Sequence, residues 1–340
     1  MESIKFLFLL LFQVVLSVFL FILFQDKSKK PEKNVSLYLM SEEPVITILL
    51  WTWPFGYRFI LNQCPSSFDI TGCFFTANRT LFLEADAVVL HQRDVCSSKD
   101  QLPQFPRPPK QYWIWFSMES PSHIVNLSFI DNLINLTMSY RADSDIFTPW
   151  GWLKKPDNAQ IFSIPKKTSL VAWVISNWNP SNRRIIYYQE LKKHIHVNIY
   201  GKQHLPLPRA NHSDTLSKYK FYLAFENSLH EDYITEKLWY NALVLGNVPV
   251  VLGPPRQNYE RFIPPDSFIH VDDFSTAQEL ASYLLELDKD DHKYQQYFNW
   301  RSKLQPESAI PWVSHYCKIC KALKEGPNYR TIPSISRWFK

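Results

Sequence analysis

The stretch that decides the fold is "YKFYLAFENSLHEDYITEKLWYNALVLGNVPVVLG", residues 219–253. It begins with an apolar run over 219–226 and ends with a second apolar run over 248–253, and each is typical of a buried strand. Between them, residues 235–245 repeat apolar side chains at helical spacing and are followed by Gly246, a helix stop signal. Strand, helix and strand in this order predict a βαβ unit of a parallel sheet.

Charged residues gather at one end of this unit. Glu226 and Asn227 close the first strand, Thr235 is placed to cap the helix, and Glu236 and Lys237 fall in its first turn. A helix N-terminus carries partial positive charge, so a lysine there is unfavourable unless an anion binds beside it. The pattern therefore predicts a phosphate site. The alternative is that Glu236 is a favourable first-turn acid and Lys237 is solvated.

A second segment, "VISNWNPSNRRIIYY" at residues 174–188, has the same plan. Ser176 and Asn177 follow an apolar strand, and Arg184 lies at the start of the next helix. Residues 166–220 hold ten Lys or Arg against two acids, which forms either a solvated basic face or a site for an anionic ligand. Open α/β sheets bind ligands beyond the carboxyl ends of their strands. Two cationic strand ends of this kind suit a diphosphate held without a metal ion.

Strands alternate with helices over most of the chain, which predicts an α/β fold of two Rossmann-like, doubly wound domains that face a cleft. We place the domains at 44–165 and 166–340, because the composition shifts near residues 156–167. The expected strands cover 45–53, 84–92 and 112–121 in the first domain, and 170–176, 196–201, 219–226, 248–253 and 267–271 in the second. The expected helices cover 181–193, 235–245 and 276–287.

The N-terminus is apolar enough to cross a membrane. Residues 6–24 are interrupted only by Gln13 and Ser17. A run of this length, at about 1.5 Å per residue, spans a hydrocarbon core roughly 30 Å thick. No small-residue cleavage site follows, so we favour an uncleaved transmembrane signal-anchor over a cleavable signal peptide. Residues 1–5 would then form a cytoplasmic tail, and residues 25–43 a short stem.

The orientation of this anchor rests on opposing signals. The lysines that follow the span favour a cytosolic catalytic part, whereas cysteines and glycosylation sequons favour an oxidising lumen. "CPSSFDITGC" and "CKIC" predict two local disulfides, Cys64–Cys73 and Cys317–Cys320, because no further Cys or His pair completes a zinc site. Cys96 is left over, available for a link between two chains of a homodimer. The candidate N-glycosylation sites are Asn34, Asn78, Asn126, Asn135 and Asn211.

The first domain offers acidic side chains. Glu119 follows the strand run in "YWIWFSMESP", so it is a candidate general base facing the cleft, or else an ordinary surface glutamate. Asp143 and Asp145 form a D-x-D pair that resembles a known metal-binding motif, but the same residues are typical of a turn. The chain has no dense basic run, which argues against a nucleic-acid partner.

Taken together, the motifs closely resemble the vertebrate α-1,3-fucosyltransferases of glycosyltransferase family 10, especially the Lewis-type α-1,3/1,4 subgroup. The resemblance covers about residues 45–340 and rests on "WTWPF", "FSMESPSH", "LTMSYRADSDIFTPWGW", "VAWVISNWNP", "KFYLAFENSLHEDYITEKLW", "VPVVLGPPRQNYERFIPPDSFIHVDDF" and "YFNWR". It implies a GT-B architecture in a single-pass type II protein of the Golgi membrane with a lumenal catalytic part. The implied reaction is inverting transfer of L-fucose from GDP-β-L-fucose to the 3-OH of GlcNAc on glycoprotein or glycolipid glycans, without metal or other cofactor.

The resemblance also implies roles for individual residues. Glu119 matches the general base, Arg184 and Lys237 match groups that neutralise the departing GDP, and Glu236 matches a ribose ligand. The other positions in the donor motifs are Ser176, Asn177, Tyr222, Glu226, Asn227 and Tyr233. The positions near the acceptor are Phe55, Arg93, Tyr140 and Trp300. The family pairs its cysteines near the two places where Cys64/Cys73 and Cys317/Cys320 lie.

Arg93 bears on acceptor choice. In the family, Arg at this position accompanies α-1,3 transfer to type 2 chains, whereas Trp accompanies α-1,4 transfer to type 1 chains, so we expect N-acetyllactosamine as acceptor. The resemblance assigns Asp143 and Asp145 to structure rather than to metal. Two alternatives remain open: a Golgi-anchored glycan-binding protein without turnover, and a metal-dependent glycosyltransferase that uses Asp143 and Asp145.

Overall fold

The computed structural model describes residues 45–62, 64, 71–95, 98–124, 126–156, 162–309 and 313–340. The predicted tail, membrane span and stem lie outside these residues, as do Asn34 and Cys96. None of the helices in the described ranges is both long and apolar enough to cross a bilayer.

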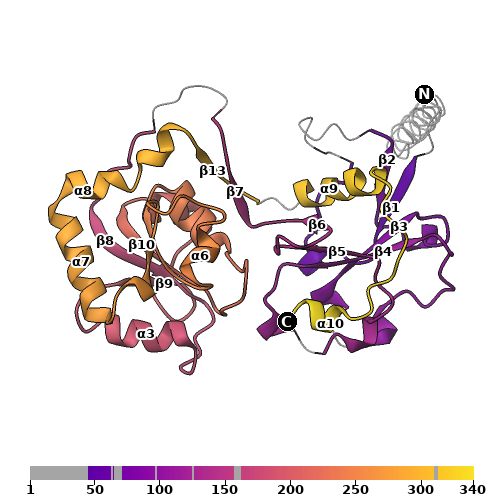
Figure 1. The fold of residues 1–340 in the computed structure, drawn as a ribbon, viewed down its shortest axis with the longest axis horizontal. Coiled ribbons are helices and arrows are strands. Elements are labelled where there is room, and N and C mark those ends of the chain that lie inside the picture. The colour runs from indigo at the N-terminus through magenta and orange to yellow at the C-terminus, as the bar shows by residue number, and fades with distance from the viewer. Residues whose placement is uncertain are drawn as a thin grey trace, which may run out of the picture. The chain divides into compact units, whose positions relative to one another are not determined.

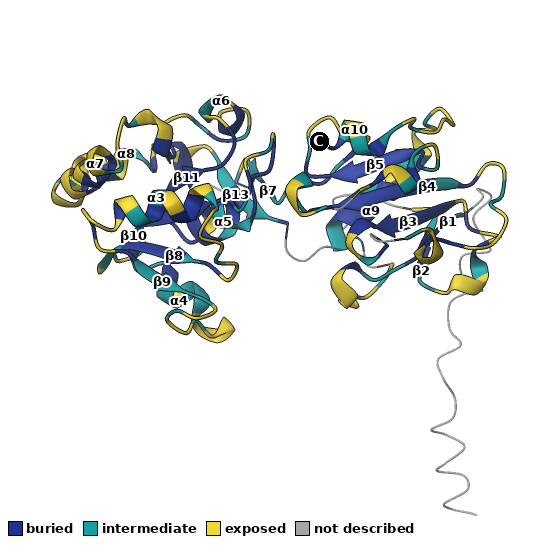
Figure 2. Ribbon diagram, turned by 90° about the horizontal axis from the view of Figure 1, so that it is seen from below, coloured by how far each residue is buried: buried dark blue, intermediate teal, exposed yellow. Residues whose placement is uncertain are grey.

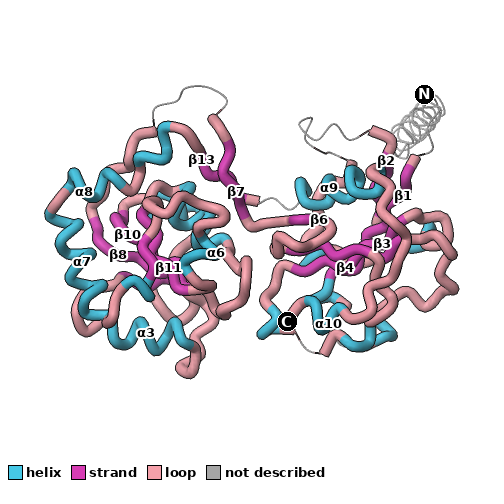
Figure 3. Tube along the Cα trace, viewed as in Figure 1, coloured by secondary structure: helices cyan, strands magenta, loops and turns pink. Residues whose placement is uncertain are grey.

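The first sheet has six parallel strands in the order β2-β1-β3-β4-β5-β6 (Figure 1). Its strands are β1 (Ile46–Leu50), β2 (Cys73–Thr76), β3 (Ala87–His91), β4 (Tyr112–Ser117), β5 (Leu136–Ser139) and β6 (Ile146–Phe147). The three strands predicted from apolar runs are confirmed as β1, β3 and β4. In the described residues from β1 to β6, the strands are joined by loops and single 3₁₀ turns, such as η1 (Pro54–Gly56), η4 (Gln92–Asp94) and η6 (Pro121–His123) (Figure 3).

The second sheet has five parallel strands in the order β12-β11-β10-β8-β9. All five coincide with predicted strands: β8 (Ser169–Val174), β9 (Asn198–Tyr200), β10 (Tyr219–Phe225), β11 (Val248–Leu252) and β12 (Ile269–His270). The helices and turns around this sheet are α3 (Arg183–Leu191), α4 (His212–Leu216), α6 (Arg256–Tyr259), η10 (Val271–Asp273), α7 (Ala277–Lys289), α8 (Asp291–Gln296) and η11 (Asn299–Ser302). The strand order reverses between β8 and β10, which makes this position the topological switch point where doubly wound sheets bind ligands.

The helix predicted over residues 235–245 is irregular. Only α5 (Glu236–Leu238) is α-helical, and Trp239–Val244 continue as a π-helix, η9. The side chain of Thr235 accepts a hydrogen bond from the backbone N–H of Lys237, so the predicted cap is confirmed. The apolar positions predicted to face the core are buried, and Gly246 ends the helix with φ +73°. A π-helix is rare and often lies at a functional site.

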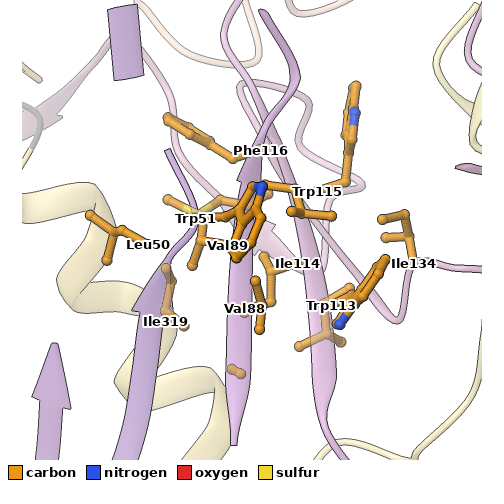
Figure 4. Close-up of a cluster of buried hydrophobic side chains, with 14 of the residues drawn as sticks. Leu50, Trp51, Val88, Val89, Trp113, Ile114, Trp115, Phe116, Ile134 and Ile319 are labelled. Atoms are coloured by element: carbon orange, nitrogen blue, oxygen red, sulfur yellow. The ribbon is translucent and has the colours of Figure 1, made fainter. Parts of the chain in front are cut away.

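The first sheet is built around aromatic side chains. Trp115 and Phe116 of β4 are fully buried, and Figure 4 shows them among aliphatic side chains of β1 and β3. Figure 2 shows that the central strands of both sheets are buried. Ile319, which the same close-up labels, comes from α9 (Val313–Lys324) near the other end of the chain.

The C-terminal segment therefore corrects the predicted domain boundary. Residues 313–340 were assigned to the second domain, yet α9 and α10 (Ile335–Trp338) pack in the hydrophobic core of the first sheet. The chain returns through β13 (Gln305–Ser308), which pairs antiparallel with β7 (Gly151–Lys154). The apolar stripe of α9 is buried against strands whose sequence lies more than 160 residues away, which local patterns cannot indicate.

The predicted disulfide pairing is wrong. The structure links Cys64 to Cys317 and Cys73 to Cys320, at sequence separations of 253 and 247 residues. Cys317 and Cys320 occupy successive turns of α9, and the packing of this helix brings each of them to a cysteine near β2. Spacing alone identified the four cysteines but not their partners.

The described sequons differ in exposure. Asn78, Asn126 and Asn211 are exposed. Asn135 is 1% exposed, its Oδ1 accepts from the backbone N–H of Trp113, and its Nδ2 donates to the carbonyl oxygen of Arg330. Glycosylation stays a prediction at all four, and at Asn135 it requires the amide to release Arg330.

Candidate functional site

The switch point brings two predicted segments together. Ser176 and Asn177 follow β8 and are exposed, and Asn227 follows the neighbouring strand β10. Asn182, the N-cap of α3, donates from Nδ2 to the carbonyl oxygen of Asn227 at 2.6 Å. Arg184 donates from Nη2 to the carbonyl oxygen of Asn177 at 2.7 Å. These contacts hold the start of α3 against the loop after β8 and the end of β10 at the switch point.

Arg184 is a buried cation without an acidic partner among the described residues. It is 3% exposed, and its guanidinium donates to the carbonyl oxygens of Asn177 and Phe225. Its Nε has no hydrogen-bond partner among the described residues. Burial lowers the pKa of Arg184, and Glu226 opposes this shift from a distance. A buried charge that lacks a counter-ion is costly. This guanidinium is therefore suited to meet an anionic ligand.

The Lys237 ammonium group is surrounded by one hydroxyl and two carboxylates. Its Nζ is 2.9 Å from Oγ1 of Thr235, 3.0 Å from Oε1 of Glu236 and 3.3 Å from Oε2 of Glu226. Burial disfavours its charged form, but Glu226 and Glu236 outweigh burial and raise the pKa of Lys237. The ammonium group is thus held charged at neutral pH, beside the first turn of a helix. The side chain of Glu236 remains partly exposed, at 34%, and can reach a ligand.

Glu226 is a buried acceptor for the residues at the start of α5. It is 1% exposed and accepts hydrogen bonds from the backbone N–H of Thr235 at 2.8 Å and from its hydroxyl at 2.9 and 3.0 Å. Burial raises the pKa of Glu226, and Lys237 partly offsets this effect. Gly253, which follows β11, lies close to this side chain, because a Cβ at Gly253 would come within 3.2 Å of Cγ of Glu226 and within 2.3 Å of the hydroxyl of Tyr259. Its contacts make Glu226 a group that orients Thr235 and Lys237.

Two predicted tyrosines are also buried. Tyr222 points into the core of the second sheet, where its hydroxyl accepts from Nδ2 of Asn241 at 2.9 Å. Tyr233 is 3% exposed and packs edge-on against Tyr140, with ring centroids 5.1 Å apart. Burial raises the pKa of Tyr233 and keeps its hydroxyl protonated. The charges of Lys237 and Glu119 both affect the pKa of this hydroxyl. Tyr233 is therefore near the predicted donor residues and near the predicted general base.

Glu119 lies at the carboxyl end of β4 with several predicted acceptor positions. Its Oε1 accepts from Nη1 of Arg93 at 3.0 Å, and Arg93 stacks over the ring of Phe55, 5.2 Å from its centroid. Phe55 in turn contacts the ring of His91, whose Nδ1 is 2.6 Å from Oδ2 of Asp94. Sequence reasoning missed His91 and Asp94, although both flank Arg93 in "HQRD". Glu119, Arg93 and Phe55 are therefore brought together.

Trp300 lies elsewhere. It is 8% exposed in the hydrophobic cluster of the second sheet, and its Nε1 donates to the carbonyl oxygen of Tyr297. Tyr140, by contrast, follows β5 and contacts Tyr233. Of the four predicted acceptor positions, Arg93 contacts Glu119 directly and Phe55 contacts Arg93. Tyr140 contacts Tyr233 instead, and Trp300 packs in the core of the second sheet.

The loop before α5 is joined to the loops that follow β4 and β5. The hydroxyls of Ser120 and Ser228 lie 2.6 Å apart, and Oγ of Ser122 lies 2.7 Å from Nε2 of His230. Asp232 accepts from the backbone N–H of Ala142 at 2.8 Å. These contacts connect the segment that bears Glu119 to the segment that bears Lys237. Sequence reasoning missed them, because they join three loops that include partners about 100 residues apart in the chain.

Asp143 and Asp145 are occupied by groups of the chain itself. Asp143 accepts two hydrogen bonds from Arg141 and one from Nε1 of Trp338. Asp145 accepts from the backbone N–H and the hydroxyl of Thr137, each at 2.7 Å. The described residues hold no group of three or more His, Cys, Asp or Glu placed to bind a metal ion.

Two parallel sheets, with cations at the switch point of one and a carboxylate at a strand end of the other, are typical of α/β proteins that bind phosphorylated ligands. Family models narrow this class. The model described as fucosyltransferase, N-terminal matches residues 43–151, and the model for the C-terminal part of glycosyltransferase family 10 (fucosyltransferase) matches residues 164–338. The chain belongs to glycosyltransferase family 10, and it is a fucosyltransferase.

Curated relatives are similar over most of their length. The 3-galactosyl-N-acetylglucosaminide 4-alpha-L-fucosyltransferase FUT3 of Pongo pygmaeus is 52% identical over 86% of this chain and 80% of its own length. The 4-galactosyl-N-acetylglucosaminide 3-alpha-L-fucosyltransferase FUT6 of Homo sapiens is 51% identical over 93% of this chain and 86% of its own. A crystal structure of an alpha1,3-fucosyltransferase with GDP-fucose matches at a TM-score of 0.54 and 18% identity, covering 89% and 96% of the two chains, and supports the fold alone.

Proposed function

We propose that this enzyme transfers L-fucose from GDP-β-L-fucose to the 3-OH of GlcNAc in N-acetyllactosamine-type glycans, which gives Lewis x type products. The names of the relatives support galactosyl-N-acetylglucosaminides as acceptors, although they divide between 3- and 4-linkage. Arg93, beside Glu119, stands at the position where the family has Arg in α-1,3 transfer. Its presence favours the 3-linkage.

The observation that carries the proposal is the buried, unpaired guanidinium of Arg184 at the switch point. A diphosphate supplies the counter-ion that the described residues do not. Lys237, beside a helix N-terminus, supplies a second positive charge. GDP-fucose carries such a diphosphate next to the bond that must break.

The reaction is a single displacement. Glu119 takes the proton of the acceptor hydroxyl, whose oxygen attacks C1 of fucose as the bond from C1 to the phosphate oxygen breaks. The leaving GDP keeps that bonding pair, and Arg184 and Lys237 stabilise its developing charge. Attack opposite the leaving group converts the β-linked donor into an α-linked product. Glu236, partly exposed beside Lys237, is placed to hold the ribose.

The proposed chemistry needs no metal, because protein cations take the part that a metal ion plays in other sugar transferases. The hydrogen bonds that Asp143 and Asp145 accept leave them occupied, which favours a structural role for both. We also propose a single-pass type II protein of the Golgi membrane. Two disulfides that join distant parts of the chain are typical of such an oxidising compartment.

A transfer assay tests the proposal. The chain is incubated with GDP-fucose and either type 2 or type 1 acceptor in excess EDTA, and product linkage is determined. We expect α-1,3-fucosylated N-acetyllactosamine and little product from the type 1 acceptor. Inactivity in EDTA that manganese restores would contradict the metal-free mechanism, and inactivity with binding of the acceptor would favour a glycan-binding protein.

A further inference from the structure

Two cavities at the outer edge of the second sheet take no part in the proposed reaction. The first, of about 520 Å³, lies along the edge strand β12 and is bounded by α7 and α8. The second, of about 540 Å³, lies between α3 and the start of α7. Phe274 lines both, so the two hollows adjoin. We call the first the β12 pocket, and none of its lining residues belongs to the donor or acceptor sets above.

Aromatic rings line the β12 pocket. The rings of Phe274 and Tyr283 have centroids 5.4 Å apart, and the hydroxyls of Tyr283 and Tyr297 lie 2.7 Å from each other. All three side chains are half-buried, so they are fixed by packing yet reach the cavity. Burial and the hydrogen bond with Tyr283 raise the pKa of Tyr297, so the Tyr297 phenol stays neutral. Fixed aromatic faces beside polar groups are suited to the apolar faces of sugar rings.

The charges of the β12 pocket are already balanced. Arg256 pairs with Glu260 at 2.8 Å and with Asp273 at 2.5 Å, donates to the carbonyl oxygen of Pro265 at 2.7 Å, and stacks on Phe268. The other lining cation, Lys293, lies 3.6 Å from a carboxylate oxygen of Asp290. This contrasts with Arg184, which has no acidic partner among the residues described. The pocket therefore does not favour an anion such as a nucleotide.

The remaining polar groups suit a neutral ligand. Gln296, Asn299 and Asp266 line the pocket and are exposed. Amides and a carboxylate can donate to and accept from hydroxyl and acetamido groups. We propose that the β12 pocket is a second carbohydrate site, which binds a neutral stretch of the same glycan class that the enzyme fucosylates. The class of ligand rests on the proposed function, whereas the existence of the pocket does not.

Hydroxyl-radical footprinting locates such binding directly. The full chain, saturated with GDP, is oxidised with and without a tetrasaccharide of two N-acetyllactosamine repeats. Half of the sites are occupied when the sugar is present at its Kd, so we expect the oxidation of Tyr283 and Tyr297 to fall by up to about half. The double variant Gln296→Ala/Asn299→Ala should lose this protection and keep its turnover of the disaccharide acceptor. The matched control is Gln295→Ala, an exposed neighbour that does not line the pocket.

Three results would overturn the proposal: unprotected Tyr283 and Tyr297, protection by inorganic pyrophosphate instead of the sugar, or protection that survives in the double variant. The test is separable from that of the proposed function. Transfer of fucose without protection of the tyrosines would contradict only the proposal of a second site. Protection without any transfer would support the second site and contradict the proposed reaction.

Discussion

At the residue scale, the surroundings of each charged group separate ligand-binding side chains from supporting ones. Arg184 at the start of α3 and Glu226 at the end of β10 are both buried. Glu226 accepts from Thr235 and pairs with Lys237, whereas the Arg184 guanidinium donates only to backbone carbonyl oxygens in the part of the chain that the structure describes. The sequence placed both residues in one donor set, because it reveals which strand end a residue occupies but not which partners it meets. Only the structure distinguishes the two roles.

Replacing Arg184 tests its assignment to the diphosphate. Arg184→Gln should raise the KM for GDP-fucose about tenfold to a hundredfold, because a charge-assisted hydrogen bond contributes roughly 1.5–3 kcal/mol. The matched control is Arg183→Gln, since Arg183 is 46% exposed and pairs with Asp272. Steady-state kinetics with varied donor give the comparison. Equal effects of the two substitutions would contradict the assignment.

At the scale of elements, apolar runs predicted strands well and tertiary packing badly. All five strands of the second sheet follow from runs such as "VPVVLG". β5, with "LTMS", was missed because a short strand that mixes polar and apolar residues has no distinct pattern. The disulfide partners were wrong because Cys317 and Cys320 are positioned by the packing of α9. The π-helix η9 likewise has no sequence signal that we recognised.

The cap of α5 should matter to catalysis as well as to stability. Thr235→Val removes the hydroxyl that joins Glu226 to Lys237, so we expect a loss of about 1 kcal/mol in the free energy of unfolding and a lower kcat or higher donor KM. Thr276→Val removes the corresponding cap of α7 and is the control. Both variants should lose similar stability by urea unfolding. Unchanged kinetics in Thr235→Val would show that the cap is only structural.

His315 on α9 should make stability depend on pH. Burial, assisted by Lys318, lowers the pKa of His315 from 6.5 to about 3. The unfolded chain therefore binds a proton that the folded chain does not, and stability is lost as pH falls from 6.5 towards 3. At pH 5 the loss is about 2 kcal/mol, at 1.36 kcal/mol per pKa unit.

Urea unfolding at pH 7 and pH 5 measures this effect. His315→Gln should reduce the difference between the two midpoints, because the variant has no group at this position that titrates in the interval. The wild-type chain provides the reference slope, since every other titrating group is shared. Identical pH slopes for the two proteins would contradict the role of His315.

At the scale of the whole molecule, the two sheets contribute different chemistry. The second sheet carries the cations at its switch point, and the loop after β4 of the first sheet carries Glu119. The contacts of Ser120 with Ser228 and of Ala142 with Asp232 join the two segments. The sequence predicted both the cations and Glu119, because these residues follow apolar strand runs. It could not predict the contacts between the loops, because no local sequence pattern indicates which distant loop each one contacts.

The substitution Glu119→Gln tests the central claim most directly. The amide keeps the size of the side chain but cannot take a proton, so kcat for transfer to N-acetyllactosamine should fall by about 10²–10⁴. The Kd for GDP should stay unchanged, because Arg184 and Lys237 are intact. A variant that transfers fucose at nearly the wild-type rate would contradict the account, because the proton would then leave by another group.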